Sequence, residues 1–105
     1  MADASSLISQ STLPANTPAI LTGATAFAAN PKRTQWYIQN LGTNPLFVLL
    51  GTGASTTVFH KVLKGSTVAN DGTGGDMGQY DGVVYCGVIT VAGTSPSYTT
   101  LEMNN

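Results

Sequence analysis

The chain has 105 residues, which is enough for one domain with one modest hydrophobic core. Four basic and five acidic residues make up only 9% of the chain, against roughly 25% in an average soluble domain, and the net charge is −1. No basic stripe and no long apolar run are present, so we expect neither nucleic acid nor a membrane as a partner.

Residues 1–30 are predicted to form an extended N-terminal arm in front of a β-sandwich domain over residues 31–105. The segment is rich in alanine, serine and threonine and is interrupted by prolines, a composition typical of chains without a core of their own. It nevertheless holds more large apolar residues than a solvated tail requires, and residues 19–28 can form a first strand. We expect the arm to lie on a neighbouring molecule through Leu7, Ile8, Leu13, Ile20 and Leu21.

The segment RTQWYIQN, residues 33–40, alternates in a way that predicts a half-buried strand. Thr34, Trp36 and Ile38 share one face. Arg33, Gln35, Tyr37 and Gln39 share the other face. We expect Trp36 in the core and Tyr37 on the outside, where a tyrosine can act as an interface contact.

Four further segments read as strands. The apolar run LFVLL predicts a strand covered on both faces, and the others alternate or are rich in β-branched residues. They cover residues 46–50, 57–64, 83–91 and 98–103. No window has helical periodicity, and turn residues recur at short spacing, so the chain is predicted to be all-β. We expect a small β-sandwich of jelly-roll type in preference to an immunoglobulin-like one.

The stretch GSTVANDGTGGDMGQYDG, residues 65–82, holds six glycines and three aspartates. No lysine or helix follows the glycines, which argues against a phosphate loop, and the spacing does not fit a calcium-binding helix–loop–helix motif. Asp-Gly pairs predict turns, so we interpret the stretch as a structural loop and a contact surface that includes Asp71, Asp76 and Gln79. The alternative is that Asp71, Asp76 and Asp81 converge on a cation.

The sequence offers little to catalysis. The one histidine, His60, and the one cysteine, Cys86, lie on separate predicted strands, and no paired carboxylates or metal-ligand spacing are present. We expect His60 to be hydrogen-bonded at the edge of the core and Cys86 to be a buried small hydrophobe. The prediction is a protein that is not an enzyme, with no catalytic residue, no cofactor and no bound metal.

Residues 33–102 resemble a recurrent type of small virion protein of tailed bacteriophages. The resemblance lies in RTQWYIQNLGTNPLFVLLG, in VLKGS, and in YDGVVYCGVITVAGTSPSYTTLE. It implies a β-sandwich decoration or cement protein, commonly a homotrimer, that sits on the outer capsid surface and binds the major capsid protein. It implies no catalytic residues, because this type of protein has none.

The low charge is in keeping with a subunit whose surface is covered in the working state. We therefore expect a structural virion protein that is made in the host cytoplasm and stabilises the phage head. The alternative is a receptor- or glycan-binding module of a phage spike or tail fibre. That function would require several aromatic side chains exposed around one end of the molecule.

Overall fold

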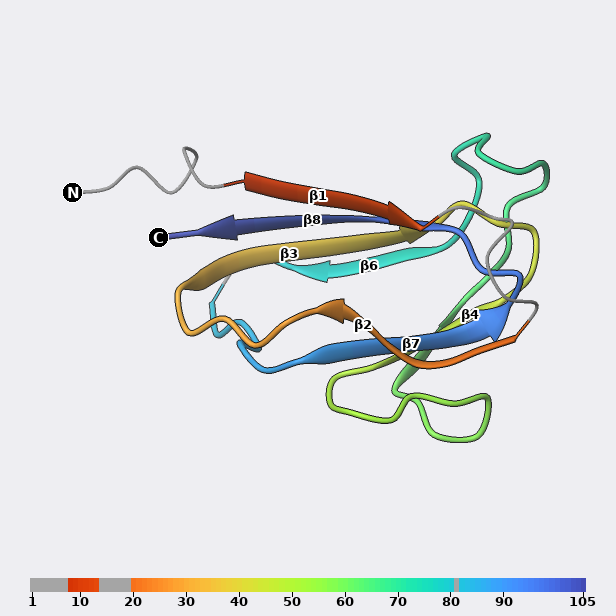
Figure 1. Cartoon of the computed structure of the whole chain (residues 1–105). Helices are drawn as coiled ribbons and strands as arrows, with labels where there is room; N and C mark the ends of the chain where they lie inside the picture. The colour runs from red at the N-terminus through yellow and green to blue at the C-terminus, as the bar shows by residue number, and fades with distance from the viewer. Residues whose placement is uncertain (1–7, 14–19, 81) are drawn as a thin grey trace.

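The computed structural model describes the backbone of residues 8–13 and the whole of residues 20–80 and 82–105. Two four-stranded antiparallel sheets face each other as two layers (Figure 1). The strands are β1 (Ile8–Leu13), β2 (Ile20–Phe27), β3 (Arg33–Asn40), β4 (Leu46–Leu49), β5 (Lys61–Leu63), β6 (Asp76–Gln79), β7 (Ile89–Thr94) and β8 (Tyr98–Asn104).

The strand order identifies a jelly roll. The first sheet, called sheet A below, has the order β1-β8-β3-β6, and the second, sheet B, has the order β2-β7-β4-β5. The pairs β1·β8, β2·β7, β3·β6 and β4·β5 are nested one inside the next and alternate between the sheets, as in a long hairpin rolled over itself. The predicted all-β fold, sandwich and jelly-roll topology are confirmed.

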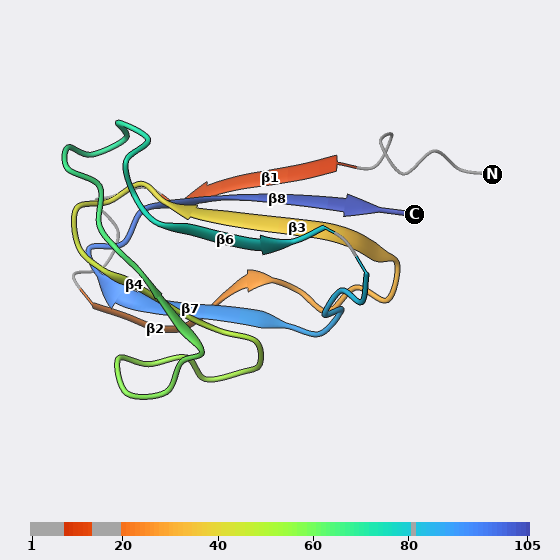
Figure 2. The same ribbon diagram turned by 180° about the vertical axis from the view of Figure 1, so that it is seen from behind.

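The two sides of the sandwich are formed by different strands. One side carries the edge strands β1 and β2, and the other carries β5 and β6, which face the viewer in Figure 2. Near the second side the layers touch, because the Gly75 amide donates to the Lys64 carbonyl over 2.9 Å. The β5 and β6 edges therefore form one continuous side surface.

The described part of the segment predicted as an arm is extended, and it is built into the sandwich. β1 pairs with β8 along its whole length, from Ile8 opposite Met103 to Leu13 opposite Tyr98. β2 pairs with β7 and confirms the strand expected within residues 19–28. In this structure β1 thus supplies an edge strand to sheet A and β2 an edge strand to sheet B. A contact of this segment with a neighbour stays a prediction.

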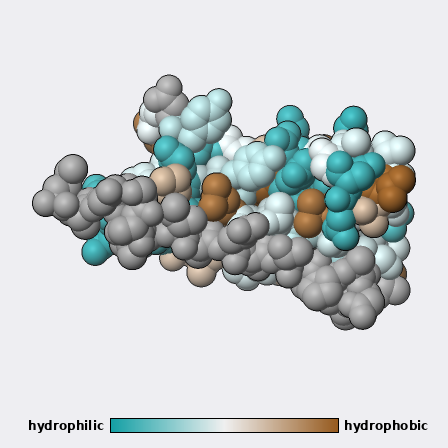
Figure 3. All heavy atoms as spheres, turned by 90° about the horizontal axis from the view of Figure 1, so that it is seen from above, coloured by the Kyte–Doolittle hydropathy of each residue, from teal (hydrophilic) through white to brown (hydrophobic). Residues whose placement is uncertain are grey.

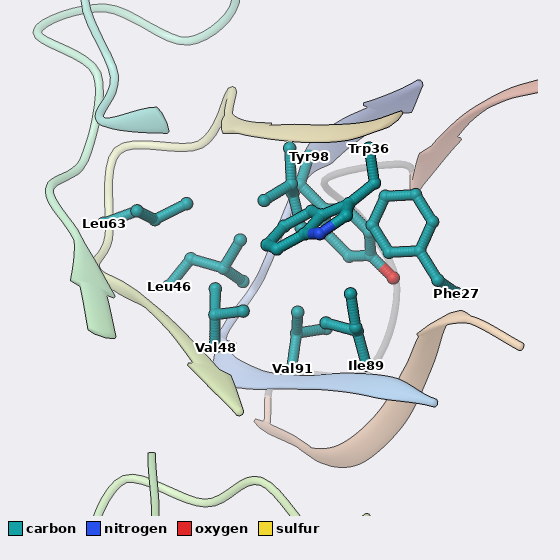
Figure 4. Packing of buried hydrophobic residues seen from close by; sticks show 9 residues of the cluster. Phe27, Trp36, Leu46, Val48, Leu63, Ile89, Val91 and Tyr98 are labelled. Carbon is teal, nitrogen blue, oxygen red and sulfur yellow. The ribbon is translucent and has the colours of Figure 1, made fainter. Parts of the chain in front are cut away.

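The core lies between the sheets, where side chains from both layers meet (Figure 4). Trp36 is only 2% exposed, and its ring meets that of Phe27 edge to face with centroids 5.6 Å apart. Ile38 is also buried, which confirms the inward face predicted for β3, and Tyr98 on β8 is buried as well. The other core members are Leu46, Val48, Leu63, Ile89 and Val91.

Arg33 is buried, and its predicted place on the outer face of β3 is wrong. The pairing of β3 with β8 shifts register just after Arg33, and this bulge turns its side chain into the sandwich. Its Nε donates to the Glu102 carboxylate at 2.7 Å in an ion pair, with the guanidinium 5.4 Å above the Phe27 ring. Its other nitrogens donate to the carbonyls of Ala28, Tyr85 and Gly87.

Asn40 lies at the opposite end of β3 and forms hydrogen bonds to neighbouring segments. Its side-chain amide donates to the carbonyls of Asn44, Leu63 and Lys64 at 2.8–3.2 Å, and its Oδ1 accepts the Gly42 amide. The side chain is 1% exposed, so water cannot replace these partners readily. Arg33 and Asn40 therefore fix the two ends of the same strand by bonding to loops.

Three predicted boundaries differ from the structure. The strand expected over residues 83–91 is β7 and starts at Ile89, because the carbonyls of residues 85–87 bond to Arg33 and to the Asn30 amide instead of to a strand. The strand expected over 57–64 is the short β5, preceded by a turn that Ser55 Oγ organises. The glycine-rich stretch contains β6, which pairs with β3.

Candidate functional site

The described residues form no pocket, and the candidate contacts that the structure describes lie partly on the surface and partly against the core. The outer face of sheet A carries Tyr37, which is half-buried and points away from the core as predicted. Its hydroxyl donates to the Asp76 carboxylate at 2.8 Å, so the structure brings these two predicted contacts together. Leu101 on β8 pairs with Tyr37 and is 37% exposed.

Tyr37 holds its proton tightly. Desolvation, the hydrogen bond to Asp76 and the negative charge of that carboxylate together raise the pKa of Tyr37 to about 12. The phenol is therefore a neutral donor over the whole physiological range. On the face seen in Figure 3, apolar side chains appear as separate spots among polar ones.

Asp71 holds the glycine-rich loop in shape. Its Oδ2 accepts the Val68 amide at 2.9 Å, and its Oδ1 accepts both the amide and the hydroxyl of Thr73. These bonds, the one from the Thr73 hydroxyl first, lower the pKa of the Asp71 carboxyl. Gly72 takes a φ of 82° in the turn, as an Asp-Gly pair predicts, and Gln39 donates to its carbonyl. The interpretation of this stretch as a structural loop is supported by these contacts.

The aspartates of the loop have separate partners. Asp71 bonds within its own turn, Asp76 accepts the Tyr37 hydroxyl, and Asp81 lies outside the described residues. No group of three histidine, cysteine or carboxylate side chains among the described residues could hold a metal ion.

Gln79 faces the interior side of β6 rather than a partner. Its Oε1 accepts the Trp36 indole N–H at 2.8 Å and the Tyr85 amide at 2.9 Å. A buried indole needs such an acceptor, so Gln79 satisfies the core tryptophan. Gln79 lies on the inward side of β6, opposite Trp36, and its role as a contact residue stays a prediction.

The predicted arm contacts lie in three different settings. Ile20, at the start of β2, is 72% exposed and available to a partner. Leu21 packs against the hydrophobic core of this chain. Ile8 and Leu13 are the two ends of β1, which forms an edge of sheet A. Leu7 lies outside the described residues.

A surface that the sequence did not single out lies at the β5 edge. Phe47 on β4 pairs with Val62 on β5, and its ring meets that of Phe59 with centroids 5.1 Å apart. Phe59 and Val62 are each 39% exposed, and Val58 is 51% exposed. Phe59 thus covers part of the outer side of β4, whose outward residues Phe47 and Leu49 are half-buried rather than buried as predicted, and an apolar patch remains exposed at this margin.

Two lysines accompany this patch. Lys61 and Lys64 stand on either side of Val62 and Leu63, and both are exposed. The sequence VFHKVLK shows these apolar and basic residues next to one another. Only the pairing of β5 with β4 adds Phe47 to the patch.

His60 and Cys86 have unrelated partners. His60 is exposed, and its Nδ1 accepts the Leu50 amide at 3.1 Å, a hydrogen bond at the margin of sheet B. Cys86 is half-buried, and its thiol lies 3.6 Å from the Arg33 carbonyl and 3.4 Å from the Val84 carbonyl.

Comparison with protein-family models, with curated proteins and with solved structures finds no match for this chain. In the part of the chain that the structure describes, no helix is long and apolar enough to cross a membrane.

Proposed function

We propose that this chain is a structural virion protein of a tailed phage, which binds the outer capsid surface as a decoration or cement protein and stabilises the head. The observation that supports it most is the combination of few charges with many large apolar side chains on the described surface. These exposed side chains are Ile20, Val58, Phe59, Val62, Val68, Tyr80, Val83 and Leu101.

Such a surface suits an assembly better than a free monomer. Soluble monomers keep large apolar side chains scattered among charges, and a sparsely charged surface gives identical copies little mutual repulsion. Nine charged residues serve the whole chain here, and one pair of them, Arg33 and Glu102, is used inside the sandwich. Binding to a lattice or to further copies would cover the apolar side chains.

The mechanism is mass action. A protein that binds the assembled shell, and not its dissociated subunits, raises the free energy of disassembly by its own binding free energy. The partners in this proposal are the major capsid protein and further copies of the chain, as a homotrimer. The jelly roll agrees with it, since capsid proteins use this architecture, although lectins and enzymes use it as well.

The aromatic residues favour decoration over a glycan-binding spike module. Sugar sites of the spike type need several aromatic rings exposed together. In the described chain Trp36 and Tyr98 are buried and Tyr37 bonds to Asp76, which leaves Tyr80 as the most exposed ring at 76%. Phe59 lies in the turn before β5 and packs against Phe47.

The test is the copy number of this chain in purified virions of the phage that encodes it, by quantitative mass spectrometry against the major capsid protein. We expect hundreds of copies, released from heads by conditions that leave the capsid lattice intact. A dozen copies or fewer would indicate a spike or tail component, and complete absence from virions would overturn the proposal.

A further inference from the structure

Two surfaces of this sandwich complement each other in charge. The basic edge, defined as Phe59, Lys61, Val62 and Lys64, runs along β5 in sheet B. The acidic face, defined as Tyr37, Asp71, Asp76 and Leu101, belongs to sheet A and the loop that enters β6. Lys61 and Lys64 are two of the three exposed cations of the described chain, with Lys32 as the third.

These charges have no counterion within the described chain. The one ion pair among the described residues joins Arg33 to Glu102 in the interior. Asp71 and Asp76 accept hydrogen bonds only from neutral donors, Thr73, Val68 and Tyr37. Neither the basic edge nor the acidic face thus uses its charges in an ion pair among the described residues, and a protein surface of opposite charge fits each of them.

Both surfaces also have an apolar centre. Phe59 and Val62 are each 39% exposed, and Phe47 contacts the Phe59 ring and pairs with Val62 across the strands. Leu101 is 37% exposed beside the ring of Tyr37, with which it forms a cross-strand pair. An apolar centre with a charged rim is the usual composition of a protein–protein interface.

The position of the two surfaces sets the symmetry of the contact. β5 and β6 share one side of the sandwich, the side turned toward the viewer in Figure 2. On this side the Gly75 amide donates to the Lys64 carbonyl. A contact between two unlike surfaces of identical chains is heterologous and repeats from copy to copy. Because both surfaces border the same side, successive copies turn that side toward a common axis, which favours a small closed ring over a filament.

We propose that the basic edge of one copy docks on the acidic face of the next copy, with Lys61 opposite Asp76 and Phe59 and Val62 against Tyr37 and Leu101. A homotrimer is the ring that agrees with the proposed function. The docking rests on the proposed function only for the premise that the chain is part of an assembly, and it specifies which surfaces and residues form the contact between copies.

The test is sedimentation velocity on the full chain and on charge-reversed variants over a wide concentration series. We expect Lys61→Glu and Asp76→Lys each to weaken self-association by at least about tenfold, because like charges then face each other. Lys32→Glu makes the same change of net charge away from the basic edge and should leave self-association within about twofold of the wild type, since exposed charges a Debye length apart are screened.

The reversed pair supplies the decisive comparison. The double variant Lys61→Glu with Asp76→Lys restores opposite charges at every junction and should associate again. If the double variant stays as weak as the single variants, the docking is wrong. A wild-type chain that remains monomeric at all concentrations overturns it as well.

A zero-length carbodiimide cross-link gives a positional check. The reagent joins a lysine amine to a carboxylate in direct contact, with loss of water and formation of an amide bond. On a mixture of ¹⁴N- and ¹⁵N-labelled chains, we expect a Lys61–Asp76 peptide that carries one label on each arm, and only same-label pairs would refute the contact. A chain that associates in this way yet is absent from virions would refute the proposed function alone.

Discussion

Replacing Arg33 by methionine removes one buried guanidinium and tests how far that group holds the sandwich together. The methionine side chain is apolar and occupies much of the space of the arginine side chain, so the variant mainly loses the hydrogen bonds and the ion pair of the guanidinium. The Glu102 carboxylate loses its ion-pair partner at 2.7 Å, and the carbonyls of Ala28, Tyr85 and Gly87 lose their donor. Three separate segments of the chain are therefore released from one side chain.

The expected loss is large for a domain of this size. Removing one partner of a buried ion pair destabilises a protein by about 3–5 kcal/mol. The Glu102 side chain is 15% exposed and can recover some hydration, which places the expectation near the lower figure, at about 3 kcal/mol. At about 4–8 °C per kcal/mol for a small domain, the midpoint of thermal unfolding should fall by about 12–24 °C.

The assay is thermal and urea unfolding followed by the fluorescence of Trp36, the single tryptophan, which is buried. Lys32→Met is the matched control, since it removes the neighbouring exposed cation and should change stability by less than about 0.5 kcal/mol. Arg33→Met combined with Glu102→Leu should recover part of the loss, because no carboxylate is then left unpaired. An Arg33→Met variant within about 0.5 kcal/mol of the wild type would refute the reasoning.

Three further predictions concern Asn40, the close approach at Gly74 and the proton of Tyr37. Asn40→Asp replaces the amide donor by a charged acceptor in front of three carbonyls. The free energy of unfolding measured with urea should therefore fall by at least about 2 kcal/mol. An unchanged urea midpoint would contradict the role of this side chain. Gly74→Ala places a Cβ against the backbone carbonyl of Asn40 and should lower the free energy of unfolding by about 2–3 kcal/mol. Gly53 has a φ of 86° and open space around it, so Gly53→Ala should lower the free energy of unfolding by only about 1 kcal/mol. Equal losses in the two variants would contradict the role of the close approach at Gly74. Tyr37 should ionise near pH 12 in the folded chain and near pH 10 in the unfolded chain, so its contribution to stability is complete below pH 10 and is lost as the pH rises through 12. In a titration followed by tyrosinate absorbance, Asp76→Asn should move the ionisation of Tyr37 toward pH 10. If this ionisation does not move, Asp76 does not hold the proton on Tyr37.

The all-β fold was predictable because β-branched and aromatic residues alternate between short turns, and the same alternation placed Trp36 and Ile38 in the core. Arg33 was misplaced because a bulge shifts the alternation by one position, and no residue type in RTQWYIQN indicates a bulge. β6 was missed because its sequence, DMGQ, resembles the loop around it, and its pairing with β3 supplies what its composition lacks.

The contact surfaces were less predictable than the fold. Tyr37 and Asp76 were anticipated one by one, but their hydrogen bond depends on the register of β6 against β3. Nothing in the sequence indicates that the Gln79 side-chain oxygen accepts the Trp36 indole N–H. The β5 edge depends on the pairing of Phe47 with Val62. These residues lie on strands that are separated in the sequence by an eleven-residue connection, residues 50–60, so their contact could not be predicted.

The nested strand pairing also determines when this protein can fold during its synthesis. β8 lies between β1 and β3, and β7 lies between β2 and β4, so residues 89–104 form an inner strand of each sheet. While the ribosome still holds them, the strands already made have no central partner, and contacts between distant segments make such folds slow, on the scale of milliseconds to seconds. A late nonsense codon, anywhere before position 89, would therefore remove the middle of both layers and with it the whole domain rather than a dispensable tail.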